Sequence, residues 1–175
     1  IIAKEIASVF EEKEIKKGAL FLKEGQVSNQ YLILKEGFMK AYSLDLDGNE
    51  VTTAFHNNSY PVFEVASFFN RSPSKENIQA LTDCYGGIIT YEQLNMLFHS
   101  IPEFRNFGRA ILVKGFASLK TRMLSMITET AEERYVALIA SNPEIFQYAP
   151  LKQIASYLGI TDTSLSRIRK EMMKK

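Results

Sequence analysis

Residues 150–170 read PLKQIASYLGITDTSLSRIRK, and their spacing predicts two short helices that meet at a tight corner. Ile154 and Leu158 recur at helical spacing, and Gly159 stands where a left-handed residue can end the first helix. Thr161 is placed to cap the start of the second helix. The stretch therefore has the layout of a helix-turn-helix motif.

The second of these helices has two chemically different faces. Leu165, Ile168 and Met172 fall on one face at i, i+3 and i+7, which predicts that they point inward. The opposite face is small, polar and basic, and it carries Thr163, Ser164, Arg167, Lys170 and Lys174. Such a face suits the major groove of duplex DNA, because short side chains allow close approach and an Arg can bind guanine through two hydrogen bonds.

The charge of this segment favours a partner that carries phosphates. Residues 151–175 hold six basic side chains and two acidic ones, a net charge near +4, whereas the whole chain carries only +1. Two other interpretations stay open. The segment can be an ordinary amphipathic hairpin whose basic side serves solubility, or a module that contacts another protein.

The composition is that of a globular chain. With 175 residues and 46% hydrophobic content, the chain can form one large core and a small satellite domain. It has no apolar run long enough to span a membrane and no secretory signal, so we expect a cytoplasmic protein without a membrane partner. Cys84 is the only cysteine, and with His56 and His99 it makes no cluster spaced for zinc or iron–sulfur ligation. We therefore expect no metal, although a metal shared between two subunits stays open.

Residues 14–91 consist of short alternating or β-branched runs, which predict strands. Gly18, Gly25 and Gly37 separate several runs, and Asp47-Gly48 between two of them predicts a hairpin. Many short strands with glycine turns favour a β-sandwich or jelly roll, preceded and followed by short helices at residues 2–10 and 92–99. The predicted strands are residues 14–16, 19–22, 31–34, 38–44, 51–55, 77–81 and 87–91.

A long helix is predicted after Pro102. Apolar residues recur there in steps of three and four to about Thr128, which corresponds to about seven turns. A helix this long has surplus apolar surface, so we expect one side to cover the β-roll and the other to pair with a second copy of the chain. Packing of the helix within its own monomer is the alternative. The residues expected at the dimer contact are Ile111, Leu112, Gly115, Phe116, Leu119, Met123 and Met126.

A further helix should follow from Thr130, because Thr130 and Glu133 have the spacing of a capping box. It should continue through Ile139, and Asn142-Pro143 should end it.

This order of elements resembles the cyclic-AMP receptor and fumarate-nitrate regulator (Crp/Fnr) family of bacterial transcription regulators, over essentially the whole chain. The resemblance implies an α+β fold with three parts. Residues 1–101 would be a sensor domain like the cyclic nucleotide-binding β-roll (a double-stranded β-helix or jelly roll), residues 102–129 the dimerisation helix, and residues 130–175 a winged-helix-like helix-turn-helix domain. The sequence blocks that carry it are Gly18 through Gly25 to Gly37, Ala131-Glu132-Glu133-Arg134, and Leu151 to Arg169.

The resemblance implies a homodimer that places two recognition helices in successive major grooves, about 34–36 Å apart, over a near-palindromic operator. It also implies RNA polymerase as a further partner. The chain would then be a transcription regulator and not an enzyme. A cupin-type metal enzyme on the jelly roll is the alternative, but His56 and His99 cannot supply the several histidines of such a site.

Matched position by position, the resemblance places Asp162, Thr163 and Arg167 where the family reads bases. Asp162 also has a structural interpretation, since an acid in the first helical turn interacts favourably with the helix dipole by roughly 0.3–1 kcal/mol. We prefer that role to contact with a cytosine. Ser166 and Arg169 are expected at phosphates along the edge of the groove. The expected DNA-binding residues are Thr161, Asp162, Thr163, Ser164, Ser166, Arg167, Arg169 and Lys170.

The predicted effector pocket departs from the family pattern. Relatives that bind cyclic nucleotides carry a Gly-Glu pair for the ribose and an Arg followed by a small residue for the phosphate, whereas here these positions hold Phe63, Glu64, Ser74 and Lys75. Lys75 supplies a point charge in place of a guanidinium fork, which disfavours a cyclic nucleotide. A different small-molecule effector, weak nucleotide binding through Lys75, and the absence of any effector all stay open, so we assign no cofactor.

Overall fold

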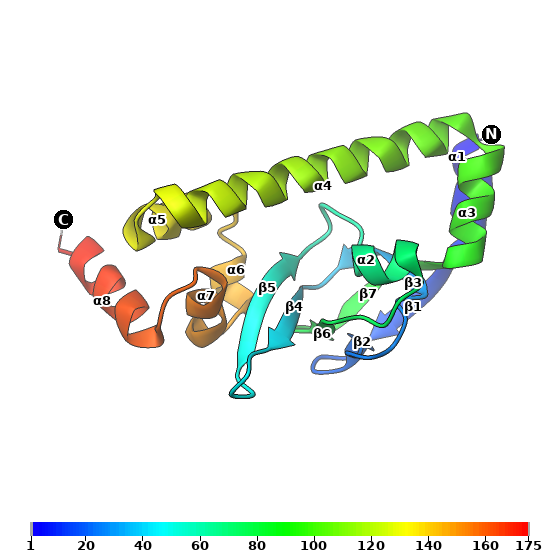
Figure 1. The fold of residues 1–175 in the computed structure, drawn as a ribbon. Helices are drawn as coiled ribbons and strands as arrows, with labels where there is room; N and C mark the ends of the chain where they lie inside the picture. Colours follow the sequence, from blue (N-terminus) through cyan, green and yellow to red (C-terminus); the bar gives the residue numbers. More distant parts are fainter. Residues whose placement is uncertain (1, 175) are drawn as a thin grey trace.

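The computed structural model describes residues 2–174 and contains two β-sheets (Figure 1). Along the chain, one helix precedes the strands, one is inserted between β5 and β6, and the others follow the last strand. The chain runs from α1 through the strands to the long helix α4, and it ends in four helices. In chain order the elements are α1 (Ile2–Val9), β1 (Glu11–Ile15), β2 (Leu20–Leu22), β3 (Gln30–Glu36), β4 (Met39–Leu44), β5 (Glu50–His56), α2 (Val65–Asn70), β6 (Asn77–Ala80), β7 (Cys84–Thr90), α3 (Tyr91–Ser100), α4 (Pro102–Thr128), α5 (Ala131–Ser141), α6 (Ile145–Tyr148), α7 (Leu151–Tyr157) and α8 (Asp162–Met172).

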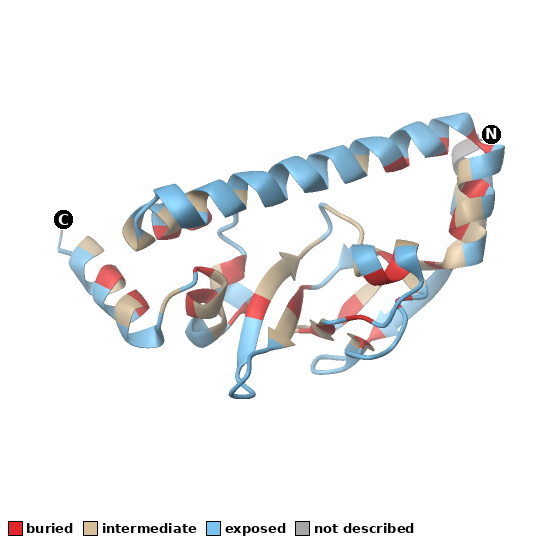
Figure 2. Cartoon of the chain, in the orientation of Figure 1, coloured by how far each residue is buried: buried red, intermediate tan, exposed pale blue. Residues whose placement is uncertain are grey.

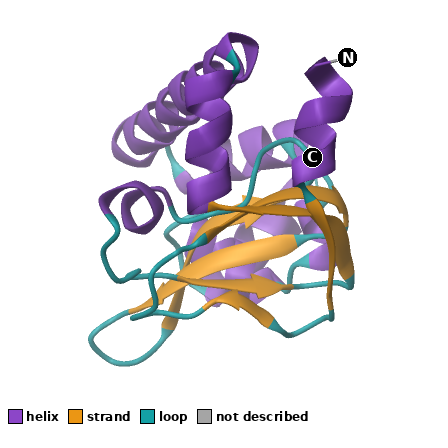
Figure 3. Cartoon of the chain, turned by 90° about the vertical axis from the view of Figure 1, so that its right-hand side faces the viewer, coloured by secondary structure: helices purple, strands orange, loops and turns teal. Residues whose placement is uncertain are grey.

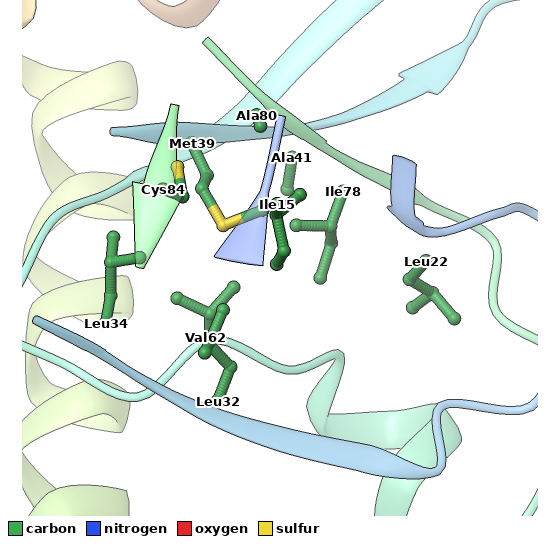
Figure 4. Close-up of a cluster of buried hydrophobic side chains, with 10 residues drawn as sticks. All are labelled: Ile15, Leu22, Leu32, Leu34, Met39, Ala41, Val62, Ile78, Ala80 and Cys84. Carbon is green, nitrogen blue, oxygen red and sulfur yellow. The ribbon is translucent and has the colours of Figure 1, made fainter. Parts of the chain in front are cut away.

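The seven strands form the predicted jelly roll, called here the β-roll (residues 11–90). One sheet has the order β1-β7-β3 and the other β2-β6-β4-β5, and all the pairings within them are antiparallel. Side chains from both sheets, among them Leu32, Met39 and Ile78, meet in a buried apolar core (Figure 4). The turn between β4 and β5 contains Gly48 with φ +81°, as the Asp-Gly signal predicts.

All seven predicted strands are confirmed, with small shifts of their ends. The largest shifts are at β1 and β7, which each start three residues earlier than predicted because Glu11 to Ile15 pair with Cys84 to Ile88. Two short helices, α2 and α6, were not predicted. Each is too short for an apolar repeat to be recognised, and α2 depends on a local cap: the Glu64 carboxylate accepts hydrogen bonds from two backbone N–H groups.

The long helix α4 has the predicted bounds, but its relation to the β-roll differs from the prediction. Of its residues only Phe104 and Gly108 are buried, and both lie near the N-terminal end, where α4 packs on α3. Beyond Gly108 the helix is almost entirely exposed (Figure 2). The expectation that one side of α4 covers the β-roll is therefore wrong beyond Gly108, because the chain leaves α3 at a corner (Figure 1) and buries no further residue of α4.

The C-terminal helices share a core with the β-roll. Phe38 from the β-roll lies in the same buried cluster as Tyr135, Ile154 and Leu165, and Phe55 and Leu81 pack against it. Seen from the side, the helices gather above and beside the two sheets (Figure 3). The position of residues 131–172 is thus fixed by contact with the sheet that ends in β5.

Candidate nucleic-acid interface

Helices α7 and α8 form the predicted helix-turn-helix. Gly159 ends α7 with φ +70°, a conformation that disfavours any side chain. Thr161 caps α8, since its hydroxyl oxygen accepts a hydrogen bond from the Ser164 N–H at 3.2 Å. The turn and the start of the second helix are therefore built as the sequence predicts.

The inner and outer faces of α8 also follow the prediction. Leu165 and Ile168 are buried, and Met172 packs partly buried against the same cluster. Ser164 and Arg169 are half-buried at the sides of the helix, whereas the other predicted DNA-binding residues are exposed: Thr161, Asp162, Thr163, Ser166, Arg167 and Lys170. A continuous polar and basic surface therefore faces away from the protein.

The cations of this surface are available to a ligand. Among the hydrogen bonds and salt bridges of residues 2–174, none involves the side chain of Arg167 or Lys170. An exposed guanidinium without an acidic partner keeps its full capacity for two parallel hydrogen bonds. In charge and in exposure, the outer face of α8 is suited to phosphate and base edges.

Two arginines fix the C-terminal end of α7, which precedes this surface. Arg122 of α4 donates to the Thr53 carbonyl of β5 and, at 3.0 Å, to the Tyr157 carbonyl of α7. Arg134 of α5 donates to the Leu158 carbonyl at 3.1 and 3.3 Å. The Tyr157 and Leu158 carbonyls are among those that a helix leaves without partners at its C-terminus, where a cation is also favoured by the dipole.

Helix α7 itself is docked on the edge strand β5. The Thr52 N–H donates to the Ser156 hydroxyl at 2.9 Å, and that hydroxyl donates to the Glu50 carbonyl at 3.4 Å. The Tyr157 ring packs on Phe55 with 5.1 Å between centroids. The helix-turn-helix unit therefore covers part of the edge of this sheet and supplies partners for two backbone groups of β5.

Helix α4 presents an apolar outer stripe, defined here as Leu112, Phe116, Leu119, Met123 and Met126. All five side chains are exposed, and Phe116 is 71% exposed. They recur in steps of four, three, four and three, the spacing of a coiled-coil seam. Of the other residues predicted at the dimer contact, Gly115 is exposed and Ile111 is half-buried. Apolar exposure on this scale marks a surface that another molecule covers.

Comparison with known proteins identifies the family. Residues 12–100, just over half of the chain, match the cyclic nucleotide-binding domain family. The fumarate and nitrate reduction regulatory protein of Vibrio cholerae is 26% identical over 168 residues, which cover 90% of this chain and 66% of that protein. The chain belongs to the Crp/Fnr family of transcription regulators. It spans about two thirds of the length of that curated relative.

Solved structures share the fold of this Crp/Fnr protein. FixK2 from Bradyrhizobium japonicum superposes with a TM-score of 0.80 at 17% identity, covering 95% of this chain and 85% of that one. The c-di-GMP responsive regulator CLP of Xanthomonas campestris superposes with a TM-score of 0.76 at 14% identity, covering 98% and 90%. The jelly-roll sheets and long helices are thus those of Crp/Fnr proteins.

The residues expected at the effector pocket of this Crp/Fnr protein are engaged within the chain. The Glu64 carboxylate accepts from the Ala66 and Ser67 N–H groups at 3.0 and 2.7 Å. The Ser74 side chain is buried, and its hydroxyl accepts from the Glu76 N–H at 3.0 Å and donates to the Glu76 carbonyl at 2.8 Å. Neither group projects an unused polar atom toward a ligand.

Phe63 and Lys75 have different surroundings. Phe63 packs on Tyr31 and Phe68, with ring centroids 4.9 and 5.4 Å apart, in an aromatic cluster that fills the space beside α2. Lys75 is exposed, and its backbone carbonyl accepts from Ser43. The aromatic residues therefore act as core, and the ammonium group of Lys75 is held by no neighbour among the described residues.

The nearby Arg71 does not replace the missing phosphate-binding arginine. It stands in a turn at the C-terminal end of α2, with φ +54°. Its guanidinium donates to the Ser28 carbonyl at 3.0 Å and to the Asn29 side chain at 2.6 Å, and it stacks 4.2 Å from the centroid of Tyr91. Its hydrogen-bonding capacity therefore serves the fold.

Two surface cavities, of about 280 and 180 Å³, lie on the β-roll. Neither is lined by Phe63, Glu64, Ser74 or Lys75. The first has Glu14, Glu36 and Asp83 in its lining, whose negative charge does not suit a phosphate.

Cys84 and the histidines do not form a metal site in the described residues, where no three His, Cys, Asp or Glu side chains are arranged so that they could hold a metal ion. Cys84 is buried, and burial raises the pKa of its thiol, so the reactive thiolate is disfavoured. Within residues 2–174 no helix combines the length and the apolar character that a membrane crossing requires.

Sequence reasoning missed the contacts that hold the helix-turn-helix in place. Arg134 belongs to the Ala131-Glu132-Glu133-Arg134 block that carries the family resemblance, so the sequence marked this residue but did not indicate which group it contacts. Arg122 carried a weaker signal, since it lies eleven residues after Ile111 and therefore on the same face of the helix. The partners of both arginines are backbone carbonyls, which no side-chain pattern reveals.

Proposed function

We propose that this chain is a transcription regulator that binds duplex DNA as a homodimer, with the outer face of α8 in the major groove. The observation that carries the proposal is the capped helix α8, whose apolar face is buried and whose basic face is exposed. Family membership supports regulation of transcription rather than catalysis, and on the same ground we propose RNA polymerase as a further partner.

The second copy of the chain is proposed to cover the outer stripe of α4. A C2 dimer buries the same patch on both subunits, and a seam of alternating four- and three-residue steps is suited to pairing of two like helices. Residues 102–129 then join a sensor domain (residues 1–101) to a DNA-binding domain (residues 130–175). Two α8 helices related by this symmetry call for a near-palindromic operator.

Roles on α8 follow from side-chain chemistry. We propose that Arg167 reads a base through its guanidinium fork and that Lys170 holds a phosphate as a point charge. Thr163 and Ser166 are proposed to approach the groove closely, since their side chains are short. Thr161 and Asp162 support the N-terminus of α8, through the cap and through the dipole respectively.

The sensor domain is proposed not to bind cyclic nucleotides in the manner of the family. The support is that the Glu64 carboxylate and the Ser74 hydroxyl are already hydrogen-bonded within the chain and that Arg71 is committed to a turn. A small-molecule effector of another chemistry stays compatible with this proposal.

DNA binding is tested with an operator selected from a random duplex pool, by fluorescence anisotropy at several salt concentrations. We expect affinity to fall steeply with salt, because bound cations release counterions from the phosphates. Arg167→Ala should lose about 1–3 kcal/mol of discrimination between operator and random DNA. Lys170→Ala should weaken both equally and reduce the salt slope by about one.

Lys23→Ala, which removes an exposed cation from the β-roll, is the control and should leave binding unchanged. Equal losses on operator and random DNA for Arg167→Ala would contradict the role assigned to that side chain. Binding that is insensitive to salt would point instead to a protein partner.

A further inference from the structure

Helix α4 is attached to the rest of its own chain mainly near its two ends, and between them the Lys114 ammonium lies 4.7 Å from the centroid of the Tyr60 ring. Near its start, Phe104 and Gly108 are buried against α3. Beyond Ile111, the only half-buried residues of α4 are Arg122 and Ser125. The C-terminal attachment therefore depends on very few side chains, and of these two residues Arg122 is the one that hydrogen-bonds to other elements.

Arg122 connects three elements at one point. Its guanidinium donates to the Thr53 carbonyl of β5 and to the Tyr157 carbonyl of α7, and its Cζ lies 4.0 Å from the centroid of the Tyr157 ring. A planar guanidinium can make two hydrogen bonds and one stacking contact at once, which an ammonium cannot. The orientation of α7 relative to α4 is thereby fixed.

The connection continues into the turn before α8. The Met126 methyl group lies against Gly159, where an added Cβ would be 2.5 Å from it. Arg134 ties the Leu158 carbonyl to the Glu129 carbonyl at the end of α4, with a distance of 2.7 Å to the latter. Only a few residues separate these contacts from Asp162, the first residue of α8.

We infer that Arg122 sets the spacing between the two half-sites that the dimer accepts. This inference rests on the proposed function. If α4 forms the dimer seam, the angle between α4 and α8 determines how far apart the two recognition helices lie. Helix α8 has 11 residues and is about 16 Å long, so a rotation of about 10° moves its far end by about 3 Å. That displacement is close to the rise of one base pair, about 3.4 Å.

Loss of Arg122 should therefore change which spacings are bound and not which half-site is read. Arg122 lies on α4 and contacts β5 and α7, whereas the residues proposed to contact bases lie on α8. Both half-sites contribute to affinity only if both helices reach them, so a wrong spacing forfeits an avidity of about 10²–10⁴-fold in a rigid dimer. A dimer in which the angle between α4 and α8 can vary loses less affinity at wrong spacings and gains less affinity at the right spacing.

The test uses duplexes that carry the selected half-site as an inverted repeat with central spacers that differ by single base pairs. Dissociation constants are measured for the full chain as wild type, Arg122→Gln and Arg122→Lys. Arg109→Gln is the matched control, because Arg109 is exposed on the same helix and the same charge is lost. Circular dichroism and sedimentation show whether each variant is folded and dimeric.

We expect the wild type and Arg109→Gln to prefer one spacing by about 100-fold or more over its neighbours. Arg122→Gln should bind adjacent spacings within about tenfold of each other, with the same half-site sequence preferred, and Arg122→Lys should be intermediate. An Arg122→Lys protein that is folded, dimeric and as selective for spacing as the wild type overturns the inference, as does an Arg122→Gln protein that is uniformly weaker. If the wild type shows no salt-sensitive binding to any duplex, the proposed function fails first, and the inference falls with it.

Discussion

Replacing Phe116 by Ala should weaken dimerisation of this chain strongly. Burial of a Phe side chain contributes about 1.5–3 kcal/mol. Because Phe116 is 71% exposed in the single chain, about 1–2 kcal/mol of that contribution is left for a partner to supply. A twofold interface contains the residue twice, so the loss per dimer is about 2–4 kcal/mol. The dimer dissociation constant should therefore rise by about 30- to 1000-fold.

Sedimentation equilibrium over a concentration series measures this constant directly. The fold of the monomer should survive, since Phe116 has few contacts in its own chain and Ala favours a helix. Thr121→Ala is the control, because Thr121 is exposed on the opposite side of α4. A change of less than about threefold for Phe116→Ala would refute the assignment of the outer stripe to the dimer interface.

Three further predictions follow from the structure. The Nε2 of His56 is buried without a hydrogen-bond partner among the described residues, and burial lowers its pKa from 6.5 to about 4. The unfolded chain then binds a proton below pH 6.5 that the folded chain does not, so stability is retained above pH 6.5 and falls by about 2 kcal/mol between pH 7 and 5. Urea unfolding should show this slope in wild type and His99→Asn but not in His56→Asn. Gly159→Ala and Gly48→Ala should each cost roughly 1–2 kcal/mol for their left-handed backbone, because the Met126 methyl group that an added Cβ at Gly159 meets is the free end of a flexible side chain and can move aside; an unfolding free energy several kcal/mol lower for Gly159→Ala than for Gly48→Ala would contradict this. Calorimetric titration with cyclic AMP and cyclic GMP should show no binding tighter than about millimolar, because Ser74 stands at the arginine position of the family and the nearby Arg71 is hydrogen-bonded within a turn, and micromolar binding would show that the pocket has been misassigned.

Local chemistry explains why so much of the fold was predictable. Gly159 and the caps at Thr130 and Thr161 act within a few residues of themselves, so the helix boundaries that they set need no tertiary information. The period of two in the strands and of three to four in α4 and α8 likewise reports which face is buried. The inner face of α8, with Leu165 and Ile168, is confirmed for this reason.

Contacts between distant segments were not predictable in the same way. The sequence shows that α4 has surplus apolar surface but not that the helix leaves the β-roll after Gly108, because that depends on the corner between α3 and α4. The same limit applies to α2, whose cap at Glu64 uses a residue that the family pattern assigns to a ligand. A carboxylate looks the same in a sequence whether it binds a ribose or a backbone N–H.

The amino-acid sequence alone determined the jelly roll, the long helix and the two faces of the recognition helix, since periodicity, glycine turns and capping residues act over a few positions. Only the tertiary structure decided that α7 docks on the edge strand β5 and that Arg122 joins α4, β5 and α7. The physical reason is that these contacts join side chains to backbone carbonyls and N–H groups, which every residue carries and which become specific partners only when the chain has folded.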